Sequence, residues 1–198
     1  QQEQSYKNGH EWKEETICSM NIKDKDIIQA IRAKSEKGFR LLMQKYKEPV
    51  YWHIRRLVIA HDDAQDATQE AFVRVFRSFS NFRDENSFRA WIFRIATNEA
   101  LRLIETRKQG QVSLDAEGYE AIGITSDSYV DYTGLESIKL QKAILSLPVK
   151  QQATFNLRYY EELSYEEIAE ATCSTTSSAK MNFHIAKEKI IKHMNSYD

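Results

Sequence analysis

Hydrophobic residues recur at helical spacing in two blocks of the chain, and strand-like alternation is scarce. The first block runs from about residue 23 to 108 and the second from about 135 to 194. Between them, residues 109–134 collect four of the six glycines together with Ser, Thr and Asp, which is typical of a linker. The pattern predicts an all-α protein. It has a polar tail (1–22), two small helical domains (23–108 and 135–198) and a linker (109–134).

Several helices are expected in the first block. An apolar face starting at Ile27 predicts a helix that Gly38 ends or bends. A second face, over residues 39–46, is expected to stop at Pro49, because proline cannot donate the helical hydrogen bond. A third face follows that proline. These apolar positions are interpreted as core.

The most regular pattern predicts a helix that starts near Asp63. Asp63 is placed to cap its first turn, and Asp66 sits where a capping-box acid belongs. Its buried stripe is expected to hold Ala64, Ala67, Ala71, Phe72, Val75, Phe76 and Phe79. The opposite, outward side carries Gln65, Asp66, Gln69, Glu70 and Arg74.

A polar loop, residues 80–86, precedes a further helix that Ser87 is placed to cap. Its expected core residues are Phe88, Ile92, Ile95, Ala96 and Leu103. Trp91 and Phe93 give this helix more aromatic surface than one face usually needs. Two interpretations of Trp91 stay open, core packing and contact with a ligand.

In the second block, Ser164 and Glu167 form a capping box before a short helix that contains Ala169. A turn near Cys173 follows, and a second helix begins near Thr175. Two helices joined by a tight turn predict a helix-turn-helix, whose second helix enters the major groove of DNA. A helical hairpin with no DNA function fits the spacing equally well. On the DNA interpretation the exposed candidates are Thr176, Ser177, Ser178, Lys180, Met181 and His184.

Charged residues are unevenly distributed along the chain, although the net charge is only −1. Residues 23–108 carry a net charge of +6, whereas residues 109–136 carry six acids and no Lys or Arg. A basic block followed by a wholly acidic segment indicates an organised distribution of charge rather than a random one. Basic charge alone is weak support for nucleic-acid binding.

Composition excludes several classes of protein. No stretch approaches the roughly 18 apolar residues of a membrane span, and the N-terminus lacks the apolar run of a signal peptide. The two cysteines, Cys18 and Cys173, have no ligand-spaced partners. They are interpreted as reduced thiols of a cytoplasmic protein without metal or cofactor.

One motif suggests an enzyme. Residues 62–66 spell DDAQD, which matches the DDxxD pattern that binds magnesium in isoprenoid synthases. That chemistry needs a second carboxylate helix facing the first. The other dense acids lie beyond the linker, and the chain is short for a cavity that holds a prenyl tail. The sequence therefore disfavours the enzyme.

Four motifs in one order resemble a known family. Residues 63–76 (DAQDATQEAFVRVF) and 87–98 (SFRAWIFRIATN) look like the "DAxDxxQExF" and "SFRxWLxRIAxN" motifs of sigma region 2. Residues 145–148 (LSLP) and 157–169 (LRYYEELSYEEIA) look like the "LxxLP" and "LRYYEGLSYEEIA" motifs of region 4. The combination resembles the extracytoplasmic-function (ECF) sigma factors of bacterial RNA polymerase. Such a factor directs the polymerase to promoters of a specific gene set and is not an enzyme.

The resemblance implies roles for particular residues. The polar face of the first motif docks on the clamp helices of the largest polymerase subunit, which places there Asp66, Gln69, Glu70 and Arg74. The loop and the second motif contact the −10 element, capturing a flipped base, which assigns Asn81, Phe82, Arg83, Trp91, Arg94 and Asn98. The helix-turn-helix then reads the −35 element. Further implied partners are the flap of the second-largest subunit and an anti-sigma factor.

The acidic linker is implied to enter electropositive channels of the polymerase, although a solvated tether fits its composition as well. Three positions depart from the family. Cys173 stands at a turn position that is usually Gly, Asn182 replaces a common Arg, and Arg102 replaces a common Asp. The main rival hypothesis is a free-standing helix-turn-helix regulator, which would have no need of the polar docking face.

Overall fold

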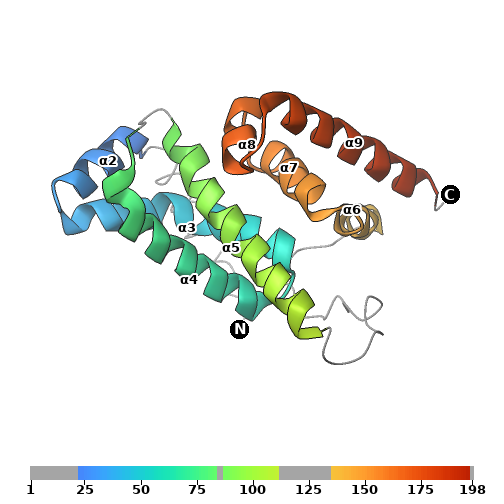
Figure 1. Ribbon diagram of the computed structural model, residues 1–198, viewed down its shortest axis with the longest axis horizontal. Helices are drawn as coiled ribbons and strands as arrows, with labels where there is room; N and C mark the ends of the chain where they lie inside the picture. Colours follow the sequence, from blue (N-terminus) through green and yellow to red (C-terminus); the bar gives the residue numbers. More distant parts are fainter. Residues whose placement is uncertain (1–21, 84–86, 112–134, 197–198) are drawn as a thin grey trace, which may run out of the picture.

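The computed structural model describes residues 22–83, 87–111 and 135–196, and the regular elements in these ranges are helices (Figure 1). The predicted all-α class with two helical domains is confirmed. Most of the predicted tail and residues 112–134 of the predicted linker lie outside the described ranges. The role of the acidic linker therefore stays a prediction.

In its described residues, the N-terminal domain contains four α-helices and a short 3-10 helix. They are α2 (Asp24–Arg32), α3 (Glu36–Val58), α4 (His61–Ser78), η1 (Phe79–Asn81) and α5 (Phe88–Gln111). Helix α2 packs on α3, and α3, α4 and α5 pack against one another around one core. Helix α5 extends to Gln111, so the first residues of the predicted linker are helical.

Gly38 and Pro49 do not break helices as predicted, because tertiary packing outweighs their local preferences. Gly38 lies in the first turn of α3, where a Cβ atom would come 2.6 Å from the backbone nitrogen of Ile31. Glycine there lets the end of α2 approach α3. Helix α3 continues through Pro49, since Tyr46 and Val50 on either side belong to one buried face.

Helix α4 differs from its prediction at both ends. It begins at His61, and its N-cap residue Ala60 makes no side-chain cap bond. The predicted cap at Asp63 is wrong, because that carboxylate pairs with Arg107 of α5. Phe76 was expected in the core but is 60% exposed. Phe39 of α3, also expected in the core, is 43% exposed beside it.

Helices α6 to α9 form the C-terminal domain, which contains the predicted helix-turn-helix. Their bounds are α6 (Leu135–Leu145), α7 (Val149–Tyr159), α8 (Tyr165–Ala171) and α9 (Thr176–Asn195). The capping box of α8 is confirmed: Ser164 N donates to Glu167 Oε2 (2.8 Å) and Glu167 N donates to Ser164 Oγ (3.2 Å). Thr175 caps α9 by accepting from Ser178 N at 3.1 Å.

The two domains pack together, with α5 lying between α4 and α8 and with α3 against α7 (Figure 1). Phe93 of α5 is fully buried in the core of the C-terminal domain, beside Leu157, Leu163 and Ile168. Helix α5 therefore has more aromatic surface than one face needs because it buries residues on two sides, one toward each domain.

Candidate functional site

The outward face of α4 carries the residues predicted to bind polymerase. Asp66, Gln69 and Glu70 are exposed, while the neighbouring Ala67 and Ala71 are buried. The predicted outward orientation of these three residues is confirmed. Their exposure leaves carboxylate and amide groups available to a partner.

Arg74 lies differently from the other three. Its guanidinium pairs with Glu99 of α5, so the side chain turns toward that helix. Glu99 is only 3% exposed in its side chain and also accepts from Arg102 Nε and a terminal nitrogen of Arg102 at 3.1 and 2.8 Å. A buried carboxylate needs such compensation, and Arg102 supplies part of it at the position where the family commonly has Asp.

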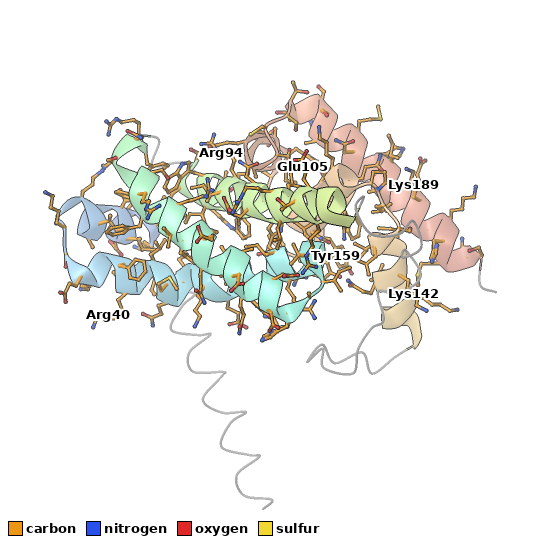
Figure 2. All side chains as sticks on the ribbon, turned by 60° about the horizontal axis from the view of Figure 1, so that its bottom comes forward. Arg40, Arg94, Glu105, Lys142, Tyr159 and Lys189 are labelled. Carbon is orange, nitrogen blue, oxygen red and sulfur yellow. The ribbon has the colours of Figure 1, made fainter. Side chains whose placement is uncertain are left out.

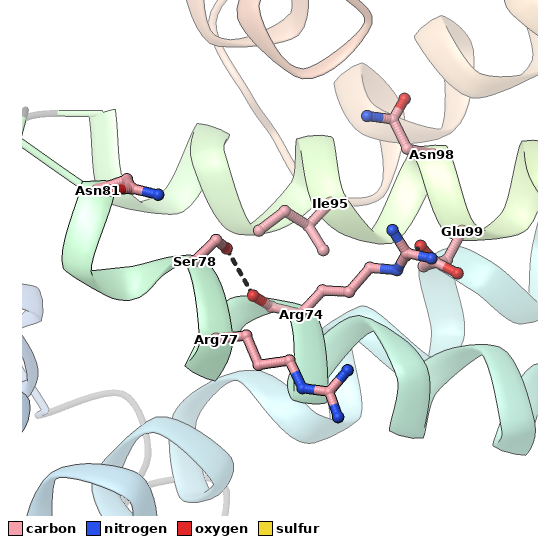
Figure 3. Close-up of a pocket in the computed structure, with 7 residues that line it drawn as sticks. All are labelled: Arg74, Arg77, Ser78, Asn81, Ile95, Asn98 and Glu99. Atoms are coloured by element: carbon pink, nitrogen blue, oxygen red, sulfur yellow. Dashed lines mark hydrogen bonds and ion pairs between the residues drawn. The ribbon is translucent and has the colours of Figure 1, made fainter.

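A cavity of about 380 Å³ opens between α4 and α5 (Figure 3). It brings together Asn81 from η1 and Asn98 from α5, two of the predicted −10 contacts, with Arg74 beside them. Three further wall residues were missed at the level of sequence: Arg77, Ser78 and Glu99. Arg77 follows Arg74 by three residues on α4, a spacing that places the two on neighbouring positions of one face. Amide, hydroxyl and guanidinium groups here suit base edges and phosphates.

Phe82 and Trp91 do not present free rings in this arrangement. They are 5% and 7% exposed and lie 4.8 Å apart between ring centroids, packed with Phe79 and Phe88. Core packing, one of the two interpretations of Trp91, agrees with this position. Their direct contact with a base would require this cluster to open.

The remaining −10 candidates lie nearer the surface. Arg83 is exposed and donates to the carbonyl oxygen of Ser80 at 2.9 Å, which braces the loop. Arg94 is half-buried on α5 (Figure 2). Arg83 lies two residues after Asn81, and Arg94 lies about one helical turn before Asn98 on α5.

The N-terminal part of α9 exposes five of its six predicted DNA contacts. Ser177, Ser178, Lys180, Met181 and His184 are exposed, and Thr176 is half-buried. Lys180 Nζ lies 5.7 Å from the ring centroid of Tyr165, and the Arg158 guanidinium lies 5.0 Å from the same ring. Tyr165 and Arg158 were missed at the level of sequence. They add aromatic and basic groups to this surface.

A polar cluster joins the two domains. Arg56 of α3 pairs with Glu161 at 3.1 Å, and Arg89 of α5 donates to the carbonyl oxygen of Glu161. Burial raises the pKa of the Glu161 carboxyl, and the charge of Arg56 opposes that rise. Gln152 Nε2 donates to the carbonyl oxygen of Arg56 at 3.1 Å. These contacts hold α3 and α5 against the C-terminal domain.

The DDxxD segment shows no magnesium site in the described part of the chain. Within those ranges, no three His, Cys, Asp or Glu side chains gather in a way that could hold a metal ion. Nor does any described helix have the length and apolar character needed to cross a membrane.

Comparison with known proteins accounts for both domains. The sigma-70 region 2 family matches residues 42–110, and the sigma-70 region 4 family matches residues 137–190. The RNA polymerase sigma-H factor of Pseudomonas aeruginosa is 28% identical over 178 residues, which cover 85% of this chain and 92% of that protein. The ECF sigma factor SigW of Bacillus subtilis is 28% identical over 185 residues, 88% of this chain and 98% of SigW. The chain belongs to the ECF sigma factors.

Solved structures share the fold of this ECF sigma factor. The sigma factor RpoE of Bartonella quintana, solved with the anti-sigma factor NepR, has a TM-score of 0.68 at 20% identity over 80% of this chain and 98% of RpoE. CnrH, solved with the cytosolic domain of CnrY, has a TM-score of 0.67 at 17% identity over 88% and 99% of the two chains.

The motif resemblance is thereby confirmed. This ECF sigma factor binds core RNA polymerase and promoter DNA and initiates transcription at the promoters it recognises. Its family consists of transcription initiation factors rather than catalytic enzymes.

Proposed function

We propose that this sigma factor docks on core RNA polymerase through Asp66, Gln69 and Glu70 of α4. The observation that carries the proposal is the exposed polar face of that helix, in a region-2 domain where the opposite side of α4 packs on α3 and α5. A free-standing DNA-binding regulator has no use for such a face. Arg74 contributes indirectly on this view, since its pairing with Glu99 braces α4 against α5.

A binding assay with purified core polymerase tests the docking residues. The double variant Gln69→Ala/Glu70→Lys reverses one charge and removes one amide, so we expect affinity to fall by about tenfold or more. Glu105→Lys is the matched control, because Glu105 is an exposed acid on α5 (Figure 2). Binding of the double variant at the wild-type level would refute the docking assignment.

The −10 element is assigned to the cavity between α4 and α5 and to its surroundings. Asn81 and Asn98 offer amide groups to a base edge, while Arg77, Arg83 and Arg94 offer charge to the strand. Extruding a base costs a few kcal/mol of stacking energy, which a polar pocket must offset. Phe82 and Trp91 support the loop through their packing, and they supply stacking surface only when the cluster opens.

The −35 element is assigned to the exposed N-terminal face of α9. The first turns of α9, a helix capped by Thr175, carry six residues assigned to contact the major groove. These are Thr176, Ser177, Ser178, Lys180, Met181 and His184. The capping box of α8 and the tight turn fix how α9 is presented.

Two further assignments follow from the relatives. RpoE of Bartonella quintana is solved in complex with the anti-sigma factor NepR, and CnrH is solved in complex with the cytosolic domain of CnrY. We propose an anti-sigma partner for this chain as well. The cytoplasm is its place of action, since polymerase and promoter are found there.

A further inference from the structure

Met181 is a large apolar side chain on the outward face of α9, and it is 58% exposed. It lies two positions after the buried Ala179, a step that turns it about 200° around the helix axis from the packed side. Ser177 and His184 lie about one helical turn before and after it, and both are exposed. The outward face therefore carries an apolar side chain between two polar ones.

Two polar groups beside Met181 have partners within the protein. His184 Nε2 lies 3.3 Å from Glu188 Oε1, one turn further along α9. Lys180 Nζ lies over the ring of Tyr165, 5.7 Å from its centroid. These contacts orient the imidazole and the ammonium group, while most of the Met181 side chain faces solvent.

The residue after Met181 lacks the positive charge that is common in the family. Asn182 is half-buried, and its Nδ2 donates to Ser178 Oγ at 3.5 Å. An amide cannot neutralise a phosphate, so this surface has one cation fewer for binding the DNA backbone irrespective of sequence. Side chains that reach the base edges therefore carry more weight in this chain.

The outward face of α9 is open to a DNA duplex in the packed protein. Helix α9 packs on α6, α7 and α8 of its own domain and lies along the outside of the molecule (Figure 1). Met181 lies on the side opposite to its buried residues, within the first two turns that enter a major groove in a helix-turn-helix.

We propose that Met181 recognises the C5 methyl group of a thymine in the −35 element and is a specificity-determining residue of this sigma factor. The inference rests on the −35 role proposed for α9. In the major groove that methyl is the apolar group that a base pair displays, and the other groups there are hydrogen-bond donors and acceptors. A methionine side chain donates no hydrogen bond and accepts only weakly. Against those groups it would displace water without replacing the hydrogen bonds.

The holoenzyme formed by the full chain and core polymerase tests the proposal. Selection from a duplex library with a randomised −35 region yields the preferred element, in which we expect thymine at one fixed position. Each thymine is then replaced in turn by deoxyuridine, which lacks only the methyl group. Burial of one methyl corresponds to about a fourfold change in affinity, so we expect that loss at the position of Met181.

Three variants assign the methyl effect to its residue. Met181→Ser should bind the thymine and deoxyuridine duplexes equally at that position. Met181→Leu should keep most of the preference, because leucine also presents apolar groups at this point of the helix. Ile191→Ser is the matched control, since Ile191 is an apolar residue of the same helix, 48% exposed and ten residues further along. It should show the wild-type effect.

The outcomes separate this inference from the −35 role itself. A selected element without a fixed thymine, or an equal methyl effect in wild type and Met181→Ser, would overturn the inference. The −35 role still stands in that case if Lys180→Ala weakens binding to the selected duplex. If Met181→Ser weakens binding to both duplexes by one factor and leaves the methyl effect in place, Met181 contacts the DNA backbone or the polymerase, and the inference is wrong. If neither Lys180→Ala nor Met181→Ser changes −35 binding, both assignments are wrong.

Discussion

Two turns of the C-terminal domain hold non-glycine residues with a left-handed backbone, Glu162 with φ 54° and Cys173 with φ 49°. A side chain in this conformation costs about 1–2 kcal/mol, which glycine avoids. Both positions correspond to Gly in the sigma motifs that the sequence resembles. The departure at Cys173 therefore places a non-glycine residue at a left-handed position, with the cost that this carries.

Cys173→Gly should therefore stabilise the protein by about 0.5–1 kcal/mol, after the greater entropy of glycine in the unfolded chain is subtracted. Urea unfolding measures the change. Cys173→Ala is the control, because alanine removes the thiol and keeps the left-handed cost. Equal stability of the glycine and alanine variants would show that the backbone stores no such strain.

Asn98 is the wall residue of the cavity that best separates promoter melting from promoter binding. It lines the cavity and is exposed. Within the described ranges its side chain makes no hydrogen bond that would support the fold. Asn98→Ala should slow open-complex formation by about tenfold and leave closed-complex binding nearly unchanged. Permanganate footprinting reports the melting, with Thr106→Ala of the same helix as control. Normal melting with Asn98→Ala would remove this residue from the −10 site.

At the scale of helices, local signals predicted the C-terminal domain better than the N-terminal one. The capping box at Ser164 and the cap at Thr175 act within one turn, so the sequence alone predicts where α8 and α9 start. The predictions at Pro49 and Gly38 were wrong because the effect of each residue depends on contacts with residues distant in the sequence.

The candidate site was predictable only in part for a related reason. Helical periodicity showed which side of α4 faces outward, and the structure agrees for Asp66, Gln69 and Glu70. It did not show that Phe76 lies outside the core, because periodicity marks apolar residues without identifying what covers them. The partner of Arg74, 25 residues along the chain at Glu99, carries no local signal.

Helix α9 provides a test of groove recognition with an internal control. Lys180 and Lys189 are nine residues apart, which places them on opposite sides of the helix, and Lys189 donates to Gln151 of α7 at 3.1 Å. Lys180→Ala should weaken duplex −35 binding and lower its salt slope by about one unit. Lys189→Ala should change neither quantity. Equal slopes for wild type and Lys180→Ala would mean that this ammonium contacts no phosphate.

At the scale of the whole molecule, the packing of one domain on the other surrounds a buried histidine. His53 is fully buried beneath Phe93, with ring centroids 5.4 Å apart. Because the Thr97 hydroxyl donates to the Phe93 carbonyl oxygen (2.7 Å), it accepts from His53 Nε2 (2.9 Å). Among the described residues, His53 Nδ1 has no hydrogen-bond partner, and protonation there would bury a charge near Arg56.

Burial, assisted by the charge of Arg56, lowers the pKa of His53 from 6.5 to about 3. Between these values the unfolded chain binds one more proton at this residue than the folded protein does. The free energy of unfolding should therefore decrease as the pH is lowered below 6.5. This group contributes up to about 1.4 kcal/mol per pH unit to that decrease. His53→Gln should reduce the slope of unfolding free energy against pH between about 5 and 6.5. His184→Gln, on the exposed face of α9, should not, and matching slopes for the two variants would contradict the role of His53.

The aromatic cluster around Trp91 has a consequence for optical measurement. The chain has three tryptophans, Trp12, Trp52 and Trp91, and none lies in the C-terminal domain. Trp91 is enclosed by Phe79, Phe82 and Phe88, next to the loop assigned to the −10 element. Its fluorescence emission is therefore that of an indole shielded from water. A shift of that emission to longer wavelength would report the opening of this cluster during promoter melting, with no dye attached.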